Sequence, residues 1–351
     1  MSPDDPRPAP PAALRLDIDR EALAANWRAL DALSGAARAG AAVKADGYGL
    51  GAQAVVPVLD EAGCRDFFVA HWSEVAPIVD LVPPGAIAVF HGPLTPADAA
   101  YARALGVKPV INSIPQARLW RDAGGGRCDL MIDTGMNRLG LPLAEIGDEA
   151  IGQLDIDVLL SHLVSAEEDT PLNALQRDRW EAARRAVPHR RASLANSAGI
   201  ALGAAYHGDL TRPGLSLYGG IQRPEYEGLI RQVARPMAAL LQVRQVEAGD
   251  TLGYNATFTA AGSMRVGTVA LGYADGYLRC WSGKGAMLSR DRRLPVLGRV
   301  SMDLTIVDLR AAPDLHEGDW VEVYYSPVAA AAVSGLSQYE LFTLLGRRFG
   351  R

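Results

Sequence analysis

Cysteine is scarce in this chain of 351 residues, and the three cysteines lie far apart in the sequence. Cys64, Cys128 and Cys280 form no CxxC pair, so they offer neither a disulfide framework nor a structural zinc site built on thiolates. An odd number of widely spaced thiols is typical of proteins that fold in a reducing compartment.

Long apolar runs and runs of basic residues are also missing. No apolar stretch approaches the roughly 18 residues of a membrane helix, which argues against a membrane partner. The first 13 residues lack the basic-then-apolar order of a signal peptide, so we expect a cytoplasmic protein. With a net charge of −5 and no lysine or arginine run, the composition also argues against a nucleic-acid partner.

The composition that is present is that of a globular protein. Hydrophobic residues make up 49% and charged residues 21%, which excludes intrinsic disorder. Aromatic residues reach only 7%, although 11 tyrosines outnumber 6 phenylalanines. The length has room for one α/β domain of about 250 residues and a smaller domain of about 100.

Short β-branched or apolar runs recur through the first two-thirds of the chain, each followed by a stretch with helical spacing. They predict the eight parallel strands of a (β/α)8 barrel of the TIM type, an α/β fold. The predicted strands are Ala41–Lys44, Phe67–Ala70, Ile87–Phe90, Pro109–Ile111, Leu130–Asp133, Val158–Ser161, Ala192–Ala195 and Asp209–Arg212. Predicted helices between them include Ser73–Leu81, Ile114–Asp122 and Leu172–Arg185.

One further run, Leu14–Ile18, precedes the predicted helix Arg20–Ala32 and exceeds the count of eight. It either opens the barrel or pairs with the C-terminal region. From about Val233 the rhythm changes to short Val-, Thr-, Gly- and Arg-rich segments separated by turn signals, which predict a β-rich domain closed by a helix near Gln338–Leu345. The predicted domains are a disordered tail over residues 1–13, a barrel over 14–232 and a β-rich domain over 233–351.

Polar residues follow five of the predicted strands, at the barrel end where enzymes of this fold carry their chemistry. These residues are Lys44, Arg138, His162, the pair Asn196 and Ser197, and Arg212. Each alone has an ordinary interpretation: a surface charge, a hydrogen-bonded core histidine, a rim ion pair or a helix N-cap. Because all of them are predicted to face one mouth, we expect a single site there.

The loops after the seventh and eighth strands have the parts of a barrel phosphate site. Ser197 supplies a hydroxyl at a helix start, and Gly214 with Leu215 supplies backbone N–H donors. A lysine, an arginine and a phosphate cradle at one mouth suggest pyridoxal 5′-phosphate (PLP), which a lysine holds as a Schiff base. No metal is suggested.

Eight motifs in order also carry a family resemblance. They are AVKADGYGLGA (42–52), IDTGMNRLG (132–140), SHLVSAEE (161–168), LANSAG (194–199), RPGLSLYG (212–219), LGYNATF (252–258), LGYADGY (271–277) and GRVSMD (298–303). Over roughly residues 14–351 the chain resembles the bacterial alanine racemases. The resemblance implies a PLP-dependent isomerase, a homodimer with shared active sites, that interconverts L- and D-alanine and supplies D-alanine for peptidoglycan.

The resemblance also implies catalytic roles. Lys44 matches the Schiff-base lysine, which acts as a base on one face of the substrate Cα. Tyr254 matches the base on the opposite face and comes from the second subunit; racemisation needs two such groups because one takes the proton and the other returns it. His162 and Arg212 match a hydrogen-bonded network with Tyr254, and Arg212 also faces the pyridine nitrogen, which it leaves unprotonated.

The remaining roles concern binding. Arg138 matches the ligand of the cofactor phenolic oxygen and the substrate carboxylate, which Met302 also contacts through its N–H from the second subunit. Tyr273 and Arg299 match an access route that favours a small side chain. The matching phosphate ligands are Tyr48, Ser197, Gly214, Leu215 and Tyr339, with Asn196 adjoining them.

The chain departs from the family pattern at Met131. Many members carry a carbamylated lysine there, whose negative charge orients the arginine that matches Arg138. Either another group or a bound anion replaces that charge, or substrate binding is looser.

The alternative functions are a racemase of broader specificity or an aldolase-like PLP enzyme on the same fold, and a non-catalytic PLP carrier. The Tyr254 motif argues against the aldolase. Together with the β-rich domain it also argues against the carrier, since a carrier needs no second base.

Overall fold

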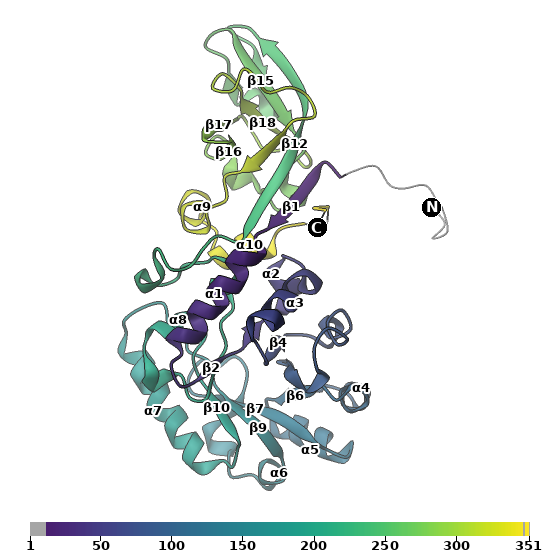
Figure 1. Ribbon diagram of the computed structural model, residues 1–351, viewed down its shortest axis with the longest axis vertical. Helices are drawn as coiled ribbons and strands as arrows, with labels where there is room; N and C mark the ends of the chain where they lie inside the picture. Colours follow the sequence, from purple (N-terminus) through teal and green to yellow (C-terminus); the bar gives the residue numbers. More distant parts are fainter. Residues whose placement is uncertain (1–11, 347, 351) are drawn as a thin grey trace, which may run out of the picture. The chain divides into compact units, whose positions relative to one another are not determined.

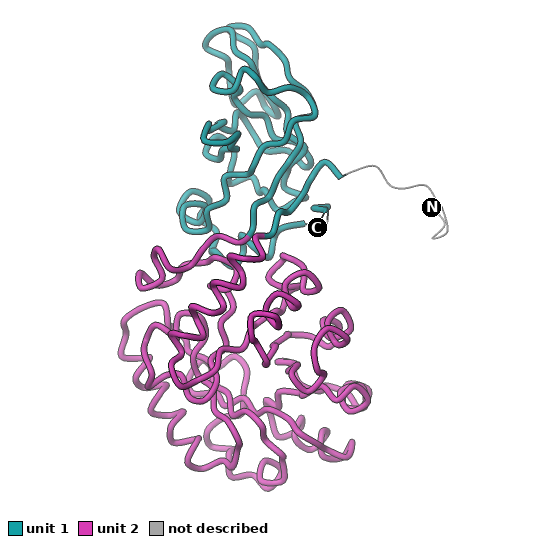
Figure 2. Tube along the Cα trace, in the orientation of Figure 1, with its two compact units in different colours: residues 1–18, 234–351 teal, residues 19–233 magenta. Residues whose placement is uncertain are grey.

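The computed structural model describes residues 12–346 and 348–350, so most of the predicted tail, residues 1–11, lies outside the described residues. The chain divides into two compact units (Figure 2). One unit is Asp19–Val233; the other joins the segment that ends at Ile18 to the chain from Ala234 onward.

The unit Asp19–Val233 is a barrel of parallel strands surrounded by helices (Figure 1). Seven strands pair side by side in the order β3-β4-β5-β6-β7-β9-β10, and β11 pairs in parallel with β2. Their bounds are β2 (Arg38–Ala39), β3 (Ala41–Ala42), β4 (Phe67–Val69), β5 (Ile87–Val89), β6 (Lys108–Ile111), β7 (Arg127–Asp133), β9 (Asp155–Leu160), β10 (Arg191–Ser193) and β11 (Leu210–Thr211), while the short β8 (Leu141–Pro142) pairs with β7.

Backbone hydrogen bonds close the ring on both sides of β11. The N–H of Arg212 donates to the Ala195 carbonyl at 2.9 Å, and the N–H of Gly40 donates to the Thr211 carbonyl at 2.9 Å. Because β2 and β3 flank Gly40, they act as one first strand, and the predicted (β/α)8 barrel is confirmed.

The outer helices begin where the sequence supplies caps. The side chains of Asp19, Thr95, Ser113 and Thr170 each accept a backbone N–H of the first turn. Proline follows Thr95 and Thr170 at the first helical position and stands at the second position after Ser113, where no intrahelical N–H is needed. The helices are α1 (Arg20–Leu33), α2 (Lys44–Tyr48), α3 (Ala52–Ala62), α4 (Pro96–Leu105), α5 (Ile114–Asp122), α6 (Glu149–Gly152), α7 (Pro171–Ala186) and α8 (Ser197–Ala201).

The predicted helix Ser73–Leu81 is wrong. The segment contains only a 3₁₀ turn, η1 (Trp72–Glu74), followed by further turns. Pro77 explains the difference, because it lies in the middle of the predicted helix and has no N–H to donate to the preceding turn.

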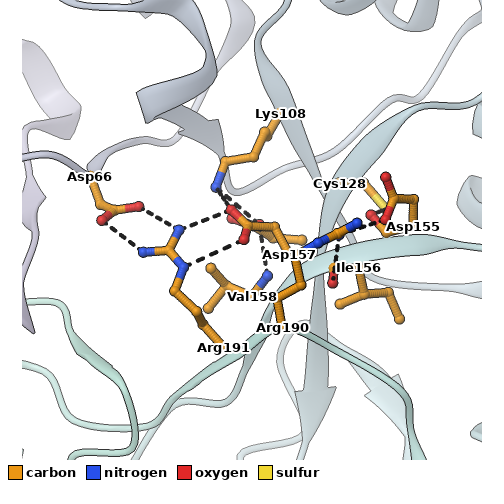
Figure 3. A network of polar contacts seen from close by, with 10 residues as sticks. Asp66, Lys108, Cys128, Asp155, Ile156, Asp157, Val158, Arg190 and Arg191 are labelled. Carbon is orange, nitrogen blue, oxygen red and sulfur yellow. Dashed lines mark hydrogen bonds and ion pairs between the residues drawn. The ribbon is translucent and has the colours of Figure 1, made fainter. Parts of the chain in front are cut away.

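An ion network lies near the amino ends of the strands, away from the strand ends that were predicted to carry the site (Figure 3). Lys108 on β6 contacts Asp129 on β7 at 3.2 Å and Asp157 on β9 at 2.7 Å. Arg191 on β10 donates to Asp157 at 2.9 Å and to both oxygens of Asp66 at 2.8 and 2.9 Å. The pKa of Asp157 is lowered to about 2, because hydrogen bonds from Arg191 and Lys108 outweigh the cost of burial.

The second unit confirms the predicted β-rich domain. The strands β12-β15-β18-β17-β16-β19 form a ring that closes because β19 also pairs with β12, all antiparallel. Their bounds are β12 (Ala234–Val246), β15 (Met264–Val269), β16 (Ala286–Ser289), β17 (Arg292–Leu297), β18 (Thr305–Asp308) and β19 (Trp320–Val323), with a small hairpin of β13 (Thr251–Leu252) and β14 (Phe258–Thr259).

The strand β1 (Leu14–Ile18) pairs antiparallel with β12, Leu14 opposite Ala238 and Ile18 opposite Ala234. Of the two predicted positions, pairing with the C-terminal region is therefore the one that occurs, and the barrel unit begins at Asp19 rather than at residue 14. The predicted closing helix is α10 (Gln338–Thr343); α9 (Pro327–Ser334) was not predicted. Among the described residues, no helix combines the length and the apolar character needed to cross a bilayer.

Candidate functional site

Lys44 follows the first barrel strand in an unusual backbone conformation. The strand β3 ends at Ala42, and Lys44 begins the short α2 instead of ending a strand as predicted. The next four residues, Ala45 to Tyr48, all have positive φ, between 53° and 64°. For residues other than glycine this conformation costs roughly 1–2 kcal/mol each, so surrounding contacts must hold it. Such strain beside a chemically competent side chain is typical of functional sites.

The surroundings of Lys44 favour its neutral form. Its Nζ lies 5.8 Å from the centroid of the Phe90 ring. Burial lowers the pKa of Lys44, and the charges of Arg138 and Arg212 lower it further, while Glu74 acts in the opposite direction. A neutral amine is the nucleophile that attacks a carbonyl carbon, so the site suits Schiff-base formation.

His162 follows β9 and is surrounded by the same cations. Burial lowers its pKa to about 3, with further lowering by Arg212, Arg138 and Lys44. The imidazole is therefore neutral at physiological pH. The backbone carbonyl of His162 accepts a hydrogen bond from Gln176 of α7 at 3.0 Å, which fixes the loop. The structure thus brings together at one mouth the four ionisable side chains that the sequence placed there.

Arg212 is 4% exposed and directs its guanidinium into the barrel wall. It donates to the Ser161 carbonyl, the Ser193 hydroxyl and, at 3.5 Å, the Leu194 carbonyl. Burial lowers its pKa to about 10, with Asp129 opposing the shift. Since Arg212 still holds its proton at neutral pH, it presents a fixed cationic donor to the site.

The segments after β10 and β11 form a small polar cradle. The Ser197 hydroxyl accepts the Gly214 N–H at 2.8 Å and the Ser216 N–H at 3.3 Å. A β-carbon added to Gly214 would lie 2.2 Å from the Tyr48 hydroxyl oxygen, so the glycine backbone adjoins that hydroxyl. Leu215 opens the 3₁₀ turn η5 (Leu215–Tyr218), whose first N–H groups have no acceptor within the turn.

Two observations indicate that this cradle suits a phosphate group. The fully buried Ser216 hydroxyl has no hydrogen-bond partner within residues 12–346 and 348–350, although buried hydroxyls normally have one. The other donors around it are hydroxyl and backbone N–H groups, as in known phosphate sites. Ser216 was not predicted, although it lies within the motif RPGLSLYG at residues 212–219. Asn196 serves as the N-cap of α8, its side-chain oxygen accepting the Gly199 N–H at 2.8 Å.

Arg138 follows β7 in a loop that Asp133 holds. The Asp133 carboxylate accepts the N–H groups of Gly135 and Met136 at 2.8 and 2.9 Å. Arg138 itself is exposed, and Met131 is buried in the apolar cluster of the barrel interior with Phe68. Met131 therefore contributes packing, and it offers no charge to Arg138.

Four of the five predicted residues of the second unit, Tyr254, Tyr273, Arg299 and Met302, gather around one loop, residues 298–302. Tyr273 begins the 3₁₀ turn η8 (Tyr273–Asp275), and its N–H donates to the Ser301 carbonyl at 3.0 Å. The next N–H, that of Ala274, donates to the Met302 carbonyl at 3.0 Å. A β-carbon added to Gly253 would lie 3.7 Å from the backbone of Arg299, which places Tyr254 beside the same loop.

The side chains of Tyr254 and Met302 are exposed, whereas that of Tyr273 is half-buried. Tyr254, in the turn η7 (Tyr254–Ala256), is 66% exposed, and Met302 is 54% exposed. Tyr273 lies under Arg279, whose guanidinium carbon is 5.3 Å from the ring centroid. Tyr339 lies on α10 and is 38% exposed.

Comparison with known proteins gives matches over nearly the whole chain. Residues 18–222 match the family described as alanine racemase, N-terminal domain, and residues 233–351 match alanine racemase, C-terminal domain. The chain is 44% identical to an alanine racemase of Methylobacterium nodulans, covering 96% of this chain and 95% of that one. It is 40% identical to an alanine racemase of Acidiphilium cryptum, covering 96% and 97%.

Two solved structures show the same architecture. Alanine racemase from Bartonella henselae, with covalently bound pyridoxal phosphate, superposes with a TM-score of 0.89 at 31% identity, covering 97% of this chain and 99% of that one. Biosynthetic alanine racemase from Pseudomonas aeruginosa gives a TM-score of 0.86 at 31% identity, covering 96% and 98%. On both domain matches and on these full-length identities, the chain belongs to the alanine racemase family.

Proposed function

We propose that the protein is a PLP-dependent alanine racemase that interconverts L- and D-alanine. The observation that carries the proposal is the joint placement of an amine with a lowered pKa, Lys44, and a phosphate-type cradle at Gly214 and Ser197. The first group suits the aldehyde of the cofactor and the second suits its phosphate. The donor set therefore fits PLP, with Tyr48 and Leu215 as further phosphate ligands, Tyr339 completing the set and Asn196 adjoining it.

When bound, PLP supplies an electron sink that acidifies the α-proton of the substrate. Lys44 holds the cofactor and, once released, serves as the base on one face of the Cα. Tyr254 serves on the opposite face, so that a proton removed by one group is replaced by the other. Arg138 binds the substrate carboxylate, together with the Met302 N–H.

Arg212 and the neutral His162 define the electronic surroundings of this chemistry. Because Arg212 keeps its proton, it would face the pyridine nitrogen of bound PLP as a hydrogen-bond donor and would leave that nitrogen unprotonated. A partner of this kind would moderate the electron-withdrawing power that bound PLP supplies, compared with an acidic partner, and would so favour return of the proton over side reactions. His162 and Arg212 support the proton transfer of Tyr254.

We propose further that the enzyme is a cytoplasmic homodimer in which each site takes Tyr254 and Met302 from the second subunit. Their exposure in the single chain supports this assignment, since a side chain that completes a neighbour's site must be accessible. Tyr273 and Arg299 of the same surface then border the access route and restrict it to small side chains. D-Alanine formed in this way would supply peptidoglycan synthesis.

The activity is tested with a panel of amino acids in deuterated water, following α-deuteration and loss of optical rotation together. We expect both for alanine and neither for amino acids with large side chains. Exchange of many amino acids at similar rates would indicate a broad-specificity racemase. A visible band from bound cofactor without any exchange would indicate a PLP carrier and contradict the proposal.

The shared site is tested by mixing two inactive variants. Lys44→Ala removes the Schiff-base lysine, and Tyr254→Phe should lower kcat by about 10²–10⁴-fold while PLP stays bound. In mixed dimers one site carries both substitutions and the other carries neither. Random mixing at equal concentration should therefore restore about a quarter of the unsubstituted activity. A mixture that stays inactive after subunit exchange would show that both bases come from one chain.

A further inference from the structure

The carboxylate of Glu74 contacts three backbone N–H groups in two separate segments. Its Oε1 accepts the Ala45 N–H at 2.6 Å, and its Oε2 accepts the N–H groups of Ala70 at 2.7 Å and His71 at 3.1 Å. Glu74 thereby joins the connection after β4 to the residue that directly follows Lys44. Hydrogen bonds to an ionised carboxylate are roughly twice as strong as neutral ones, so this is a firm attachment.

The attachment point is the first residue of the left-handed run. Ala45 has φ 53°, and the run continues through Asp46 to Tyr48. Asp46, the second residue of the run, accepts the Ala52 N–H with its carboxylate at 2.7 Å, which ties the run to the start of α3. Two carboxylates thus hold the strained segment, Glu74 through the Ala45 N–H and Asp46 through the Ala52 N–H, and the direction of both Lys44 and Tyr48 depends on this segment.

The charge of Glu74 also acts on Lys44. The ionisable groups that act on the lysine amine are Arg138 after β7, Arg212 after β11 and Glu74 on η1. The two arginines lower the pKa of Lys44 and Glu74 raises it. The rings of His71 and His91 contact each other edge to face, with centroids 4.1 Å apart. The pKa of His91 is lowered by burial and by His71 and Lys44, while Glu74 opposes the shift.

We propose that Glu74 is a positioning residue for Lys44: its carboxylate holds the left-handed turn through Ala45 and supplies the negative charge that balances Arg138 and Arg212. The inference rests on the proposed function, because its consequence is measured in the reaction of Lys44 with PLP. It goes beyond that function in assigning a role to a side chain that does not touch substrate or cofactor.

The test uses full-length Glu74→Gln and Glu74→Ala, with Asp80→Asn as a matched control on an exposed carboxylate of the same connection. Each protein is stripped of cofactor and titrated with PLP. Glu74→Gln keeps one acceptor oxygen but loses the charge, and we expect its Kd for PLP to rise about tenfold. Glu74→Ala loses all three contacts, and we expect a rise of roughly a hundredfold. Asp80→Asn should match the unsubstituted protein.

The pH dependence of the PLP association rate separates positioning from general stability. The rate increases with pH as Lys44 loses its proton. Removing the negative charge of Glu74 lowers the pKa of Lys44 further, so the midpoint should move to lower pH in Glu74→Gln and stay in place in Asp80→Asn.

Unchanged Kd and midpoint in Glu74→Gln would overturn the inference. Weaker binding with an unmoved midpoint would overturn it too, because a purely structural contact gives that pattern. Failure of the proposed function has another signature: the unsubstituted protein itself would not take up PLP, and the inference would fall with it.

Discussion

The hydroxyl oxygen of Tyr48 lies so close to Gly214 that a β-carbon added to the glycine would be 2.2 Å from it. The same carbon would lie 2.9 Å from Tyr48 Cζ and 3.4 Å from the β-carbon of Ala42. Tyr48 belongs to the turn after the first barrel strand, and Gly214 follows the last. The absence of a side chain at Gly214 therefore allows these two segments to meet at the proposed phosphate cradle.

Gly214→Ala should displace Tyr48 and raise the Kd for PLP about 10- to 100-fold, which corresponds to about 1.4–2.7 kcal/mol. The measurement is a PLP titration of cofactor-stripped protein. Gly147→Ala is the control, since nothing lies within 4 Å of the added carbon there. In a Tyr48→Phe background the same alanine should cost less, because part of the clash is removed. Equal Kd values for Gly214→Ala and the unsubstituted protein would contradict the assignment of Gly214 to the cradle.

The site residues could be placed from the sequence where they directly follow a barrel strand. Arg138, His162 and Ser197 follow β7, β9 and β10, and parallel strands that close into a barrel bring their carboxyl ends together whatever the details of packing. The strand that leads to Lys44 was predicted in the right place, but it was predicted to continue to Lys44 and it ends at Ala42. A left-handed run that includes three non-glycine residues depends on contacts with Glu74 and α3 that no local pattern indicates.

Contacts between segments that are far apart in the sequence could not be predicted either. Leu14–Ile18 has the alternation of a strand, but the sequence does not indicate whether it pairs with the barrel or with the C-terminal region. It pairs with β12, whose free edge exists only once the C-terminal domain has folded. Lys108 at a strand start resembles a surface charge in the sequence. It is buried, because Asp129 and Asp157 on two neighbouring strands supply its counter-charges.

Lys108→Met should lower the free energy of unfolding by about 3–5 kcal/mol, since it leaves Asp129 and Asp157 buried without their shared cation. The measurement is equilibrium unfolding in urea. Arg121→Met is the control: Arg121 pairs with Asp122 on the surface at 2.9 Å, and the loss should be within about 1 kcal/mol. Equal effects of the two substitutions would show that the interior network contributes no more than a surface pair.

His162 should make the protein less stable in acid. Its pKa is about 3 in the folded protein and roughly 6.5 in an unfolded chain, so between these values the unfolded chain binds a proton that the folded site excludes. The stabilising contribution is therefore present above about pH 6.5 and is lost as the pH falls toward about 3. In His162→Gln, the free energy of unfolding should depend less on pH over this range, by up to about 5 kcal/mol in total. His316→Gln, which alters a histidine with a side chain 76% exposed, should keep the pH dependence of the unsubstituted protein.

Arg138 should make substrate binding depend on the anions in solution. Its guanidinium is exposed, and the buried Met131 occupies the position to which the family resemblance assigns a negatively charged carbamate. An exposed guanidinium without that partner attracts a small anion, and the anion then orients it for the substrate carboxylate. Replacing chloride with a bulky, weakly binding anion at constant ionic strength should raise the KM for alanine several-fold and leave kcat nearly unchanged, because the arginine acts in binding. Arg138→Lys should lose this dependence together with most of the affinity for alanine, since a lysine cannot bind a carboxylate through two parallel hydrogen bonds. A KM that does not change with the anion would show that Arg138 is held in place by the protein alone.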